Sequence, residues 1–534
     1  MKTVIALKII NLIKSEFIKN YSVKKLIIIS FIMLIFTILF VEVSKIYYQI
    51  NSDIQSSQSY LANTKIEIDR LSNIKNRTLE EEYNLKIHQI NYQTYSYLET
   101  LKMRRSDDYR IVLMDQILFS LSNKLAIEIY KENYNSPDIK KICNTSNNTF
   151  NSKFEGVINH ICSFSLEEIT DMYQKDIKII DDYTNILKSN SYYMYVKYQL
   201  DNNYLDEETS KLAKIIVDNK VKDDDNYLSH NMREYQSLIT ASSFIPEKEN
   251  EFKVDDYYAI TNYKDYIRYH TYLKNEAVQN QKIIMYSSKH QIPHDLSFSY
   301  DNNVNTPYQT TKTYVNLILH YSIIVMILVS ITSSCIVSKE HSSGTIKNII
   351  TSPVKRWKIL LSKFIYLILH TYIIWLIGLI FLIIYSGIRF GFTDLLTPKL
   401  IFINNHVVEI NYFIYLLKEL FVASIPVVFF LSILLFLSAI TLNTSITTST
   451  TSVIAILSMF NWYICYKFDI KVLAYIPFTI LDMGFIHDKI QEYTNIFKVM
   501  DFNYGIVIII SIILTLIMYL ITAIIYSKRD IKNV

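Results

Sequence analysis

The residues best suited to bind a charged partner lie in one short segment, 339–363, between two long apolar stretches. This segment reads KEHSSGTIKNIITSPVKRWKILLSK and holds six lysine or arginine side chains against one carboxylate, Glu340. Loops on the cytoplasmic face of a membrane carry such an excess of positive charge. Ser342 or Ser343 can cap a helix of about two turns, which Pro353 would end. We therefore expect a docking element for a cytoplasmic partner.

Nucleotide hydrolysis within this chain is excluded by the spacing of its glycines. A P-loop needs Gly-x-x-x-x-Gly-Lys-Ser/Thr, so that backbone N–H groups can cradle phosphates. No two of the seven glycines have that spacing, since they stand at 156, 344, 378, 387, 391, 484 and 505. The metalloprotease, hydrolase-elbow and Cys-x-x-Cys patterns are also absent from the sequence. We expect no catalytic, cofactor-binding or metal site.

A few polar residues interrupt the apolar stretches and are candidates for a transport pathway. His370 and Asn461 are expected near the middle of the membrane, and Thr447 belongs to a Ser/Thr cluster near the inner mouth. Interhelical hydrogen bonding is the alternative role for all three, and we favour it. The inner parts of the apolar stretches contain no Asp or Glu, which argues against ion-coupled transport.

The positions of the apolar residues predict an all-α membrane protein. Half of the 534 residues are hydrophobic, and runs of about 20 apolar residues predict six transmembrane helices. Between the first two helices lies a large extracellular domain, which its long glycine-free stretches predict to be mainly helical. The predicted order is an amphipathic interfacial helix 1–23, span 24–46, extracellular domain 47–313, span 314–338, cytoplasmic loop 339–358, span 359–387, extracellular loop 388–414, spans 415–441 and 446–467, a re-entrant or amphipathic extracellular segment 468–504, span 505–526 and a cytoplasmic tail 527–534.

The distribution of charge predicts the orientation. Residues 49–312 hold 38 acidic and 31 basic residues, a net charge of −7, so the remainder of this +4 chain carries +11. Most of that positive charge lies in residues 1–25, 339–363 and the C-terminal tail. With six spans all three fall on one side, which the positive-inside rule makes cytoplasmic. Both termini are therefore expected in the cytoplasm.

Two cysteines in the exported segment are expected to pair. Cys143 and Cys162 stand 19 positions apart, and an oxidising exterior would let them close a loop worth about 3 kcal/mol. The alternative is two free thiols, which a reducing habitat would permit.

The loop between the second and third spans resembles the first cytoplasmic loop of ABC-2 type ABC transporter permeases. In that family this loop carries a coupling helix, here 341–352, which sits in a groove of the ATPase subunit. The resemblance implies an ATPase-coupling role for Glu340, Gly344, Thr345, Ile346, Lys347, Ile350, Pro353 and Arg356. Outside this loop the motifs match weakly, over about 1–48 and 313–534, and the extracellular domain is left out.

This resemblance implies the permease subunit of an ATP-driven exporter in a bacterial plasma membrane. The ATPase would be a separate chain, a second permease would complete a homodimer or heterodimer, and neither a cofactor nor a nucleic acid is expected. The substrate class would be antimicrobial peptides, drugs or lipids.

Two other classes of protein remain open on the sequence, and one of them, an ion-coupled secondary transporter, is disfavoured by the lack of Asp and Glu in the inner parts of the spans. The chain also resembles the phage-infection-protein and type VII secretion accessory families, which share one span, a large ectodomain and then five spans. It would then be a receptor or secretion scaffold. The basic loop alone is also compatible with binding of anionic membrane lipid.

Overall fold

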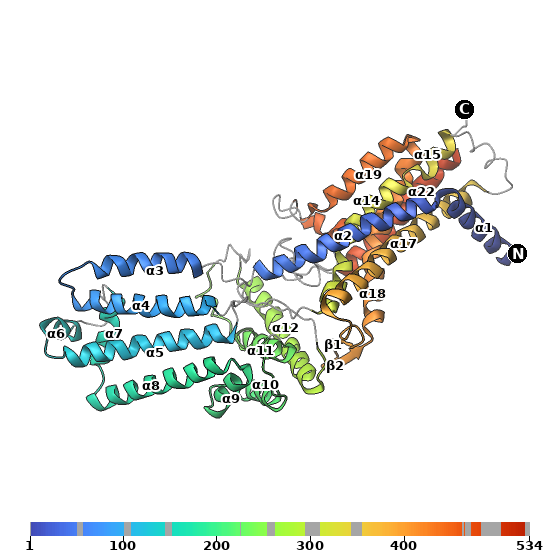
Figure 1. Cartoon of the computed structure of the whole chain (residues 1–534). Helices are drawn as coiled ribbons and strands as arrows, with labels where there is room; N and C mark the ends of the chain where they lie inside the picture. Colours follow the sequence, from blue (N-terminus) through green and yellow to red (C-terminus); the bar gives the residue numbers. More distant parts are fainter. Residues whose placement is uncertain are drawn as a thin grey trace. The chain divides into compact units, whose positions relative to one another are not determined.

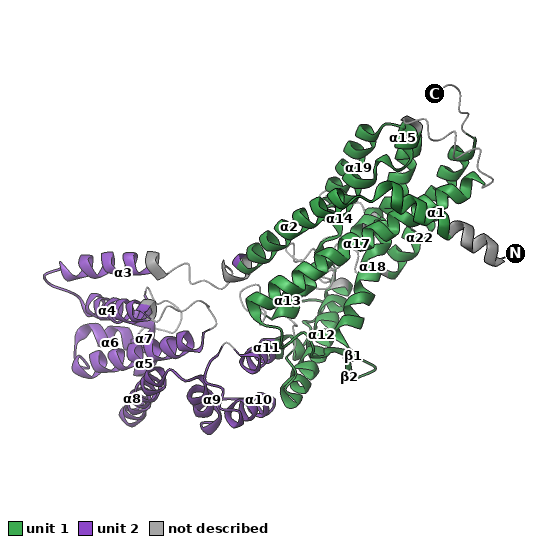
Figure 2. Cartoon of the chain, turned by 45° about the vertical axis from the view of Figure 1, so that its right-hand side comes forward, with its two compact units in different colours: residues 1–45, 238–298, 309–534 green, residues 46–237, 299–308 purple. Residues whose placement is uncertain are grey.

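Helices make up most of the part of the chain that the structure describes. This computed structural model describes residues 2–50, 57–100, 108–144, 152–224, 226–253, 262–293, 310–342, 355–461, 464, 471–481 and 504–528 (Figure 1). The chain divides into two compact units (Figure 2). Unit 1 comprises residues 1–45, 238–298 and 309–534, and unit 2 comprises residues 46–237 and 299–308.

Unit 1 contains the long apolar helices. Its elements are α1 (Lys2–Asn20), α2 (Val23–Ile50, whose last residues fall in unit 2), α12 (Tyr263–His290), α13 (Thr311–Val315), the 3-10 helix η1 (Asn316–His320), α14 (Ser322–Ser333), α15 (Cys335–Ser342), α17 (Arg356–Phe390), β1 (Lys399–Ile403), β2 (His406–Ile410), α18 (Tyr412–Thr441), α19 (Thr444–Ser458), η2 (Lys471–Tyr475), η3 (Pro477–Ile480) and α22 (Tyr504–Lys528).

Among the residues that the structure describes, five helical segments are long and apolar enough to cross a membrane. They are Val23–Ile46, Ser322–Glu340, Arg356–Phe390, Tyr412–Thr441 and Gly505–Lys528. The predicted span 446–467 is described as the 15-residue helix α19, and most of its remainder lies outside the described residues. Six spans therefore stay a prediction, while five candidate spans are present.

The second span is segmented where the sequence predicted one helix over 314–338. Its first residues form α13 and η1, and the helix then breaks again at Ser334, between α14 and α15. The hydroxyls of Ser330 and Thr332 donate to the carbonyls of Met326 and Leu328 one turn earlier. Such back-bonding competes with the backbone ladder and bends helices, which fits the position of this break.

A β-hairpin connects the third span to the fourth, where the sequence analysis expected only a loop. Strands β1 and β2 pair antiparallel, with Lys399 opposite Ile410 and Ile403 opposite His406. The two-residue turn between them is formed by Asn404 and Asn405, both with positive φ. Asn tolerates this conformation better than most residues, so the turn type follows from the local sequence.

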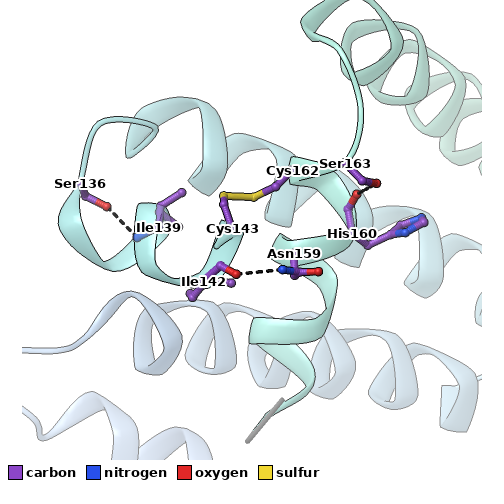
Figure 3. Close-up of a disulfide and its surroundings, with 8 residues drawn as sticks. All are labelled: Ser136, Ile139, Ile142, Cys143, Asn159, His160, Cys162 and Ser163. Atoms are coloured by element: carbon purple, nitrogen blue, oxygen red, sulfur yellow. Dashed lines mark hydrogen bonds between the residues drawn. A yellow bond between two sulfur atoms is a disulfide. The ribbon is translucent and has the colours of Figure 1, made fainter. Parts of the chain in front are cut away.

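The described part of unit 2 is helical, as expected from its glycine-poor sequence. Its helices are α3 (Ser57–Ser72), α4 (Leu79–Thr100), α5 (Tyr109–Glu132), α6 (Pro137–Cys143), α7 (Lys153–Cys162), α8 (Leu166–Ser189), α9 (Tyr192–Asp201), α10 (Glu207–Asp218) and α11 (Tyr227–Ser242), the last of which continues into unit 1. Its core is apolar and rich in tyrosine, and α5 packs along α8. A disulfide joins Cys143 at the end of α6 to Cys162 at the end of α7 (Figure 3).

Candidate functional site

The two ends of the predicted coupling segment are described, and its middle is not. Helix α15 ends at Ser342, and α17 begins at Arg356 after the N-cap residue Lys355. The coupling residues predicted between these ends lie outside the described residues, namely Gly344, Thr345, Ile346, Lys347, Ile350 and Pro353. Their role therefore stays a prediction, and the candidate site is built from the two helices that carry the loop.

A fully buried lysine lies between two carboxylates next to these helix ends. The Nζ atom of Lys363, on α17, is 2.7 Å from Oε1 of Glu340 on α15 and 2.9 Å from Oε1 of Glu16 on α1. The side chain of Lys363 is 0% exposed, and those of Glu340 and Glu16 are 10% and 5% exposed. A cation this deep in a protein needs opposite charges at hydrogen-bonding distance, and both carboxylates supply them.

Two further polar side chains of α1 complete this group. Nζ of Lys19 lies 3.5 Å from Oε1 of Glu340, and Nδ2 of Asn20 donates to Oε2 of Glu16 at 3.1 Å. We call Glu16, Lys19, Glu340 and Lys363 the Lys363 cluster. It contains two positive and two negative charges, so it is neutral in total. The short contacts to Lys363 allow Glu16 and Glu340 to be buried, while the exposed Lys19 balances the second negative charge.

The beginning of α17 is also attached to the end of α22. Nη1 of Arg356 donates to the carbonyl of Ser527 at 2.9 Å, and the hydroxyl of Tyr519 donates to the carbonyl of Trp357 at 3.2 Å. A guanidinium at the C-terminus of a helix interacts favourably with the helix dipole. Arg356, predicted as a coupling residue, is therefore placed in a contact between two helices.

These contacts bring four helix ends to one end of unit 1. The last turns of α1, α15 and α22 and the first turns of α17 meet there (Figure 2). We call this the loop end of unit 1, because the segment 343–354 must start and finish there. The other end, which carries β1 and β2, is the hairpin end.

His370 is held in a contact between helices. Its Nε2 is 2.9 Å from the hydroxyl of Thr332 on α14, and its side chain is buried. The imidazole stacks on the ring of Tyr366 at 5.7 Å and meets the ring of Tyr21 edge-on at 5.6 Å. This geometry supports the interhelical hydrogen bond that the sequence analysis favoured.

Thr447 and Asn461 have partners of their own. The buried Thr447 hydroxyl donates to the carbonyl of Asn443 at 2.9 Å and lies 2.8 Å from the Thr441 hydroxyl. Asn461 Nδ2 donates to Oγ1 of Thr479 at 2.8 Å. The structure thus gives the three candidate pathway residues separate sets of partners and does not join them into one site.

Sequence reasoning missed the two most deeply buried members of the Lys363 cluster. The sequence pattern places Lys363 among the cations of the loop segment and does not single out Glu16. A signal was present for each: Glu16 is the only acidic residue before residue 42, and Lys363 falls within the apolar stretch 359–387. A lone charge within such a stretch predicts a buried partner or a functional role.

No group of three or more His, Cys, Asp or Glu side chains within the described residues could hold a metal ion. The described part of the candidate site contains only ion pairs, hydrogen bonds and ring contacts. Such contacts can join helices and transmit movement between them.

The helical fold and the five candidate spans among the described residues define the chain as a multi-pass membrane protein. The family model for ABC-2 family transporter proteins matches residues 10–531, and the chain belongs to this family. This match runs through segment 47–313, which the motif resemblance had left out. No curated protein and no solved structure matches the chain. Members of the family lack an ATPase domain of their own, and they generally pair with an ABC ATPase.

Proposed function

We propose that the chain is the permease subunit of an ATP-driven exporter, and that the 339–358 loop receives force from a separate ATPase subunit. The observation that carries this proposal is the arrangement of the helices on either side of the loop. Lys363 joins α15 and α17 through Glu340, and Arg356 joins α17 to α22. A push on the loop would therefore reach three candidate spans.

In the proposed mechanism, a displacement of the 339–358 loop is passed to the spans through α17. Closure of two ATPase subunits on ATP would press on the loop, and α17 would carry the displacement along its 35 residues, about 52 Å at 1.5 Å per residue. An α-helix is stiff over this length unless its hydrogen-bond ladder is interrupted. The hairpin end would then move together with the loop end.

A six-span topology with a cytoplasmic loop end is part of the proposal. The beginning of α19 lies beside the junction of α14 and α15, since the hydroxyl of Thr448 is hydrogen-bonded to that of Ser334. Helix α22 also finishes at the loop end. Since α22 runs toward the loop end, its beginning faces the hairpin end, and this direction supports a sixth crossing between the beginning of α19 and the beginning of α22.

Two observations support an extracellular location for segment 47–313. The disulfide in unit 2 requires an oxidising compartment to persist. The excess of negative charge in this segment contrasts with the basic loop end. A substrate that leaves the membrane on this side would be exported, and we propose antimicrobial peptides, drugs or lipids as its class.

Co-purification with the ATPase tests the docking role of the loop. Replacing Gly344 and Ile346 by glutamate introduces two charges where the proposal places a short helix in an apolar groove. We expect the yield of bound ATPase to fall about tenfold, which corresponds to roughly 1.4 kcal/mol of binding energy. The matched control is Asn404→Glu at the hairpin end, which should leave the yield unchanged. Full retention of the ATPase by the loop variant would refute the docking role.

A further inference from the structure

We infer that Lys363 is a positioning residue for energy coupling. It fastens the N-terminal helix α1 to α15 and α17, the helices on either side of the loop, so that these three helices move as one body. The inference rests on the proposed function, because it assumes that an ATPase pushes on the loop. It goes beyond that function by assigning roles to Lys363, Glu16 and the helix that carries Glu16.

The position of Lys363 lets it connect three helices close to the loop. Its ammonium group contacts one carboxylate on α15 and one on α1, and it is itself part of α17. Glu340 stands two residues before the end of α15, and Lys363 stands seven residues after the start of α17, about 10 Å along the helix. The contact therefore lies close to both points where force would enter.

Burial makes this contact stiff. A surface ion pair exchanges easily with water and constrains two helices only weakly. The Lys363 side chain is 0% exposed, so no water competes for its carboxylate partners from outside. If one helix moved away alone, a buried charge would be left without compensation, and that state is strongly disfavoured.

Helix α1 also packs directly on α17 through apolar and aromatic side chains. The turn between α1 and α2 reinforces the same position, because Nζ of Lys25 donates to the carbonyls of Asn20 and Thr332. Phe17 also packs its ring against Tyr366 of α17 at 4.9 Å. These contacts hold α1 on α17, and the Lys363 cluster adds α15 to the same group.

The test uses the full chain in complex with the ABC ATPase that co-purifies with it. Spin labels are placed on cysteines at Ile18 and Trp357, both exposed, after Cys335 and Cys465 are changed to serine. The distance between the labels is measured without nucleotide and with MgATP and orthovanadate. A second pair of labels, at Ile18 and the exposed Val453, reports movement of α1 relative to α19, which contributes no residue to the Lys363 cluster.

In the wild type, the Ile18–Trp357 distance should be narrowly distributed and unchanged by nucleotide, while the Ile18–Val453 distance should shift. The key variant is the triple change Glu16→Gln, Glu340→Gln and Lys363→Met. It removes all three buried charges together, so no uncompensated charge disfavours folding. We expect it to keep its ATPase but to lose the narrow Ile18–Trp357 peak when nucleotide is added.

Two further variants separate positioning from a general effect on folding. Lys363→Arg keeps a cation between the carboxylates and should retain the narrow peak. Lys24→Met removes an exposed lysine close in sequence to the end of α1 and should behave as wild type.

A result that contradicts the proposed function differs from one that contradicts the role of Lys363. Loss of the ATPase from the wild-type complex would overturn the proposed function itself. A triple variant that binds the ATPase and keeps the narrow, nucleotide-independent peak would overturn only the role of Lys363. A wild-type Ile18–Trp357 distance that nucleotide changes would also overturn this role, because α1 would then not move with α17. An unshifted Ile18–Val453 distance in the wild type would overturn the proposed transmission of force.

Discussion

At the scale of single residues, the buried charge of Lys363 is compensated by two carboxylates. Removing one partner of a buried ion pair costs about 3–5 kcal/mol, because the other charge is left in a medium of low polarity. Lys363 avoids this cost through two carboxylates that come from two different helices. Compensation by residues distant in sequence therefore holds three helices together at the loop end.

Asp176 in unit 2 is a buried carboxylate with weaker compensation. It lies on α8, and burial raises its pKa above the ordinary value, while hydrogen bonds from Ser120 and Asn123 partly offset the effect. The unfolded chain thus releases this proton at a lower pH than the folded chain. Stability is therefore lost as the pH rises from the unfolded pKa through the raised folded pKa.

We predict that Asp176→Asn stabilises the protein at pH 7 by about 1 kcal/mol, since the amide is uncharged and can keep a hydrogen bond. At a pH below both pKa values the aspartate is already protonated, so the gain should vanish. Thermal unfolding of the purified full chain at both pH values measures this, with Asp201→Asn at an exposed position as the control. A gain that is equal at both pH values would contradict the explanation.

At the scale of helices, α17 approaches its neighbours closely because of one glycine. A Cβ atom at Gly378 would lie 2.5 Å from Cε of Met33 on α2 and 3.1 Å from the ring of Tyr321. Small residues commonly allow such approaches between helices in membranes.

Gly378→Val should destabilise the protein by about 1–3 kcal/mol, because overpacking forces neighbouring side chains out of their preferred rotamers. The unfolding midpoint of the full chain in detergent provides the measurement. Leu376→Val is the matched control, since Leu376 lies on the same helix and is 55% exposed. Equal midpoints for the two variants would show that the close approach at Gly378 does not matter for stability.

The α6–α7 pair illustrates covalent support of short helices. Both helices have ten residues or fewer, and Asn159 Nδ2 donates to the carbonyl of Ile142 at 2.8 Å beside the disulfide (Figure 3). Helices this short are marginal without tertiary support.

Replacing Cys143 and Cys162 by serine should lower the free energy of unfolding by about 3 kcal/mol, as expected for a closed loop of this length. Limited proteolysis of the full chain should then cleave between α6 and α7 sooner than in the parent. Cys335→Ser removes a free cysteine and is the control. An unchanged cleavage rate would indicate that non-covalent contacts alone support this region.

At the scale of the whole molecule, the orientation in the membrane can be tested directly. In the Cys335→Ser, Cys465→Ser background we place single cysteines at Lys355 and Asn404. An impermeant maleimide should label position 404 in intact cells at least about tenfold faster than position 355, because the basic loop end is retained inside. Position 355 should react after permeabilisation. The reverse pattern would invert the proposed topology.

Much of this architecture could be predicted from residues close together in sequence. The apolar blocks predicted the five segments that are candidate spans, and the scarcity of glycine predicted helices in unit 2. The structure joins Cys143 to Cys162, the pair that the sequence analysis selected. The hairpin was missed, although Asn404 and Asn405 carry its turn signal.

Local sequence alone determined helix, turn and loop in these cases because the deciding interactions are backbone hydrogen bonds and burial of neighbouring side chains. The candidate site is different, since its deciding contact joins Lys363 to a carboxylate 347 positions away. No local pattern specifies which buried charges will meet. Only the packing of α1, α15 and α17 brought Glu16, Glu340 and Lys363 together, because a charge removed from water is stable only beside its partner.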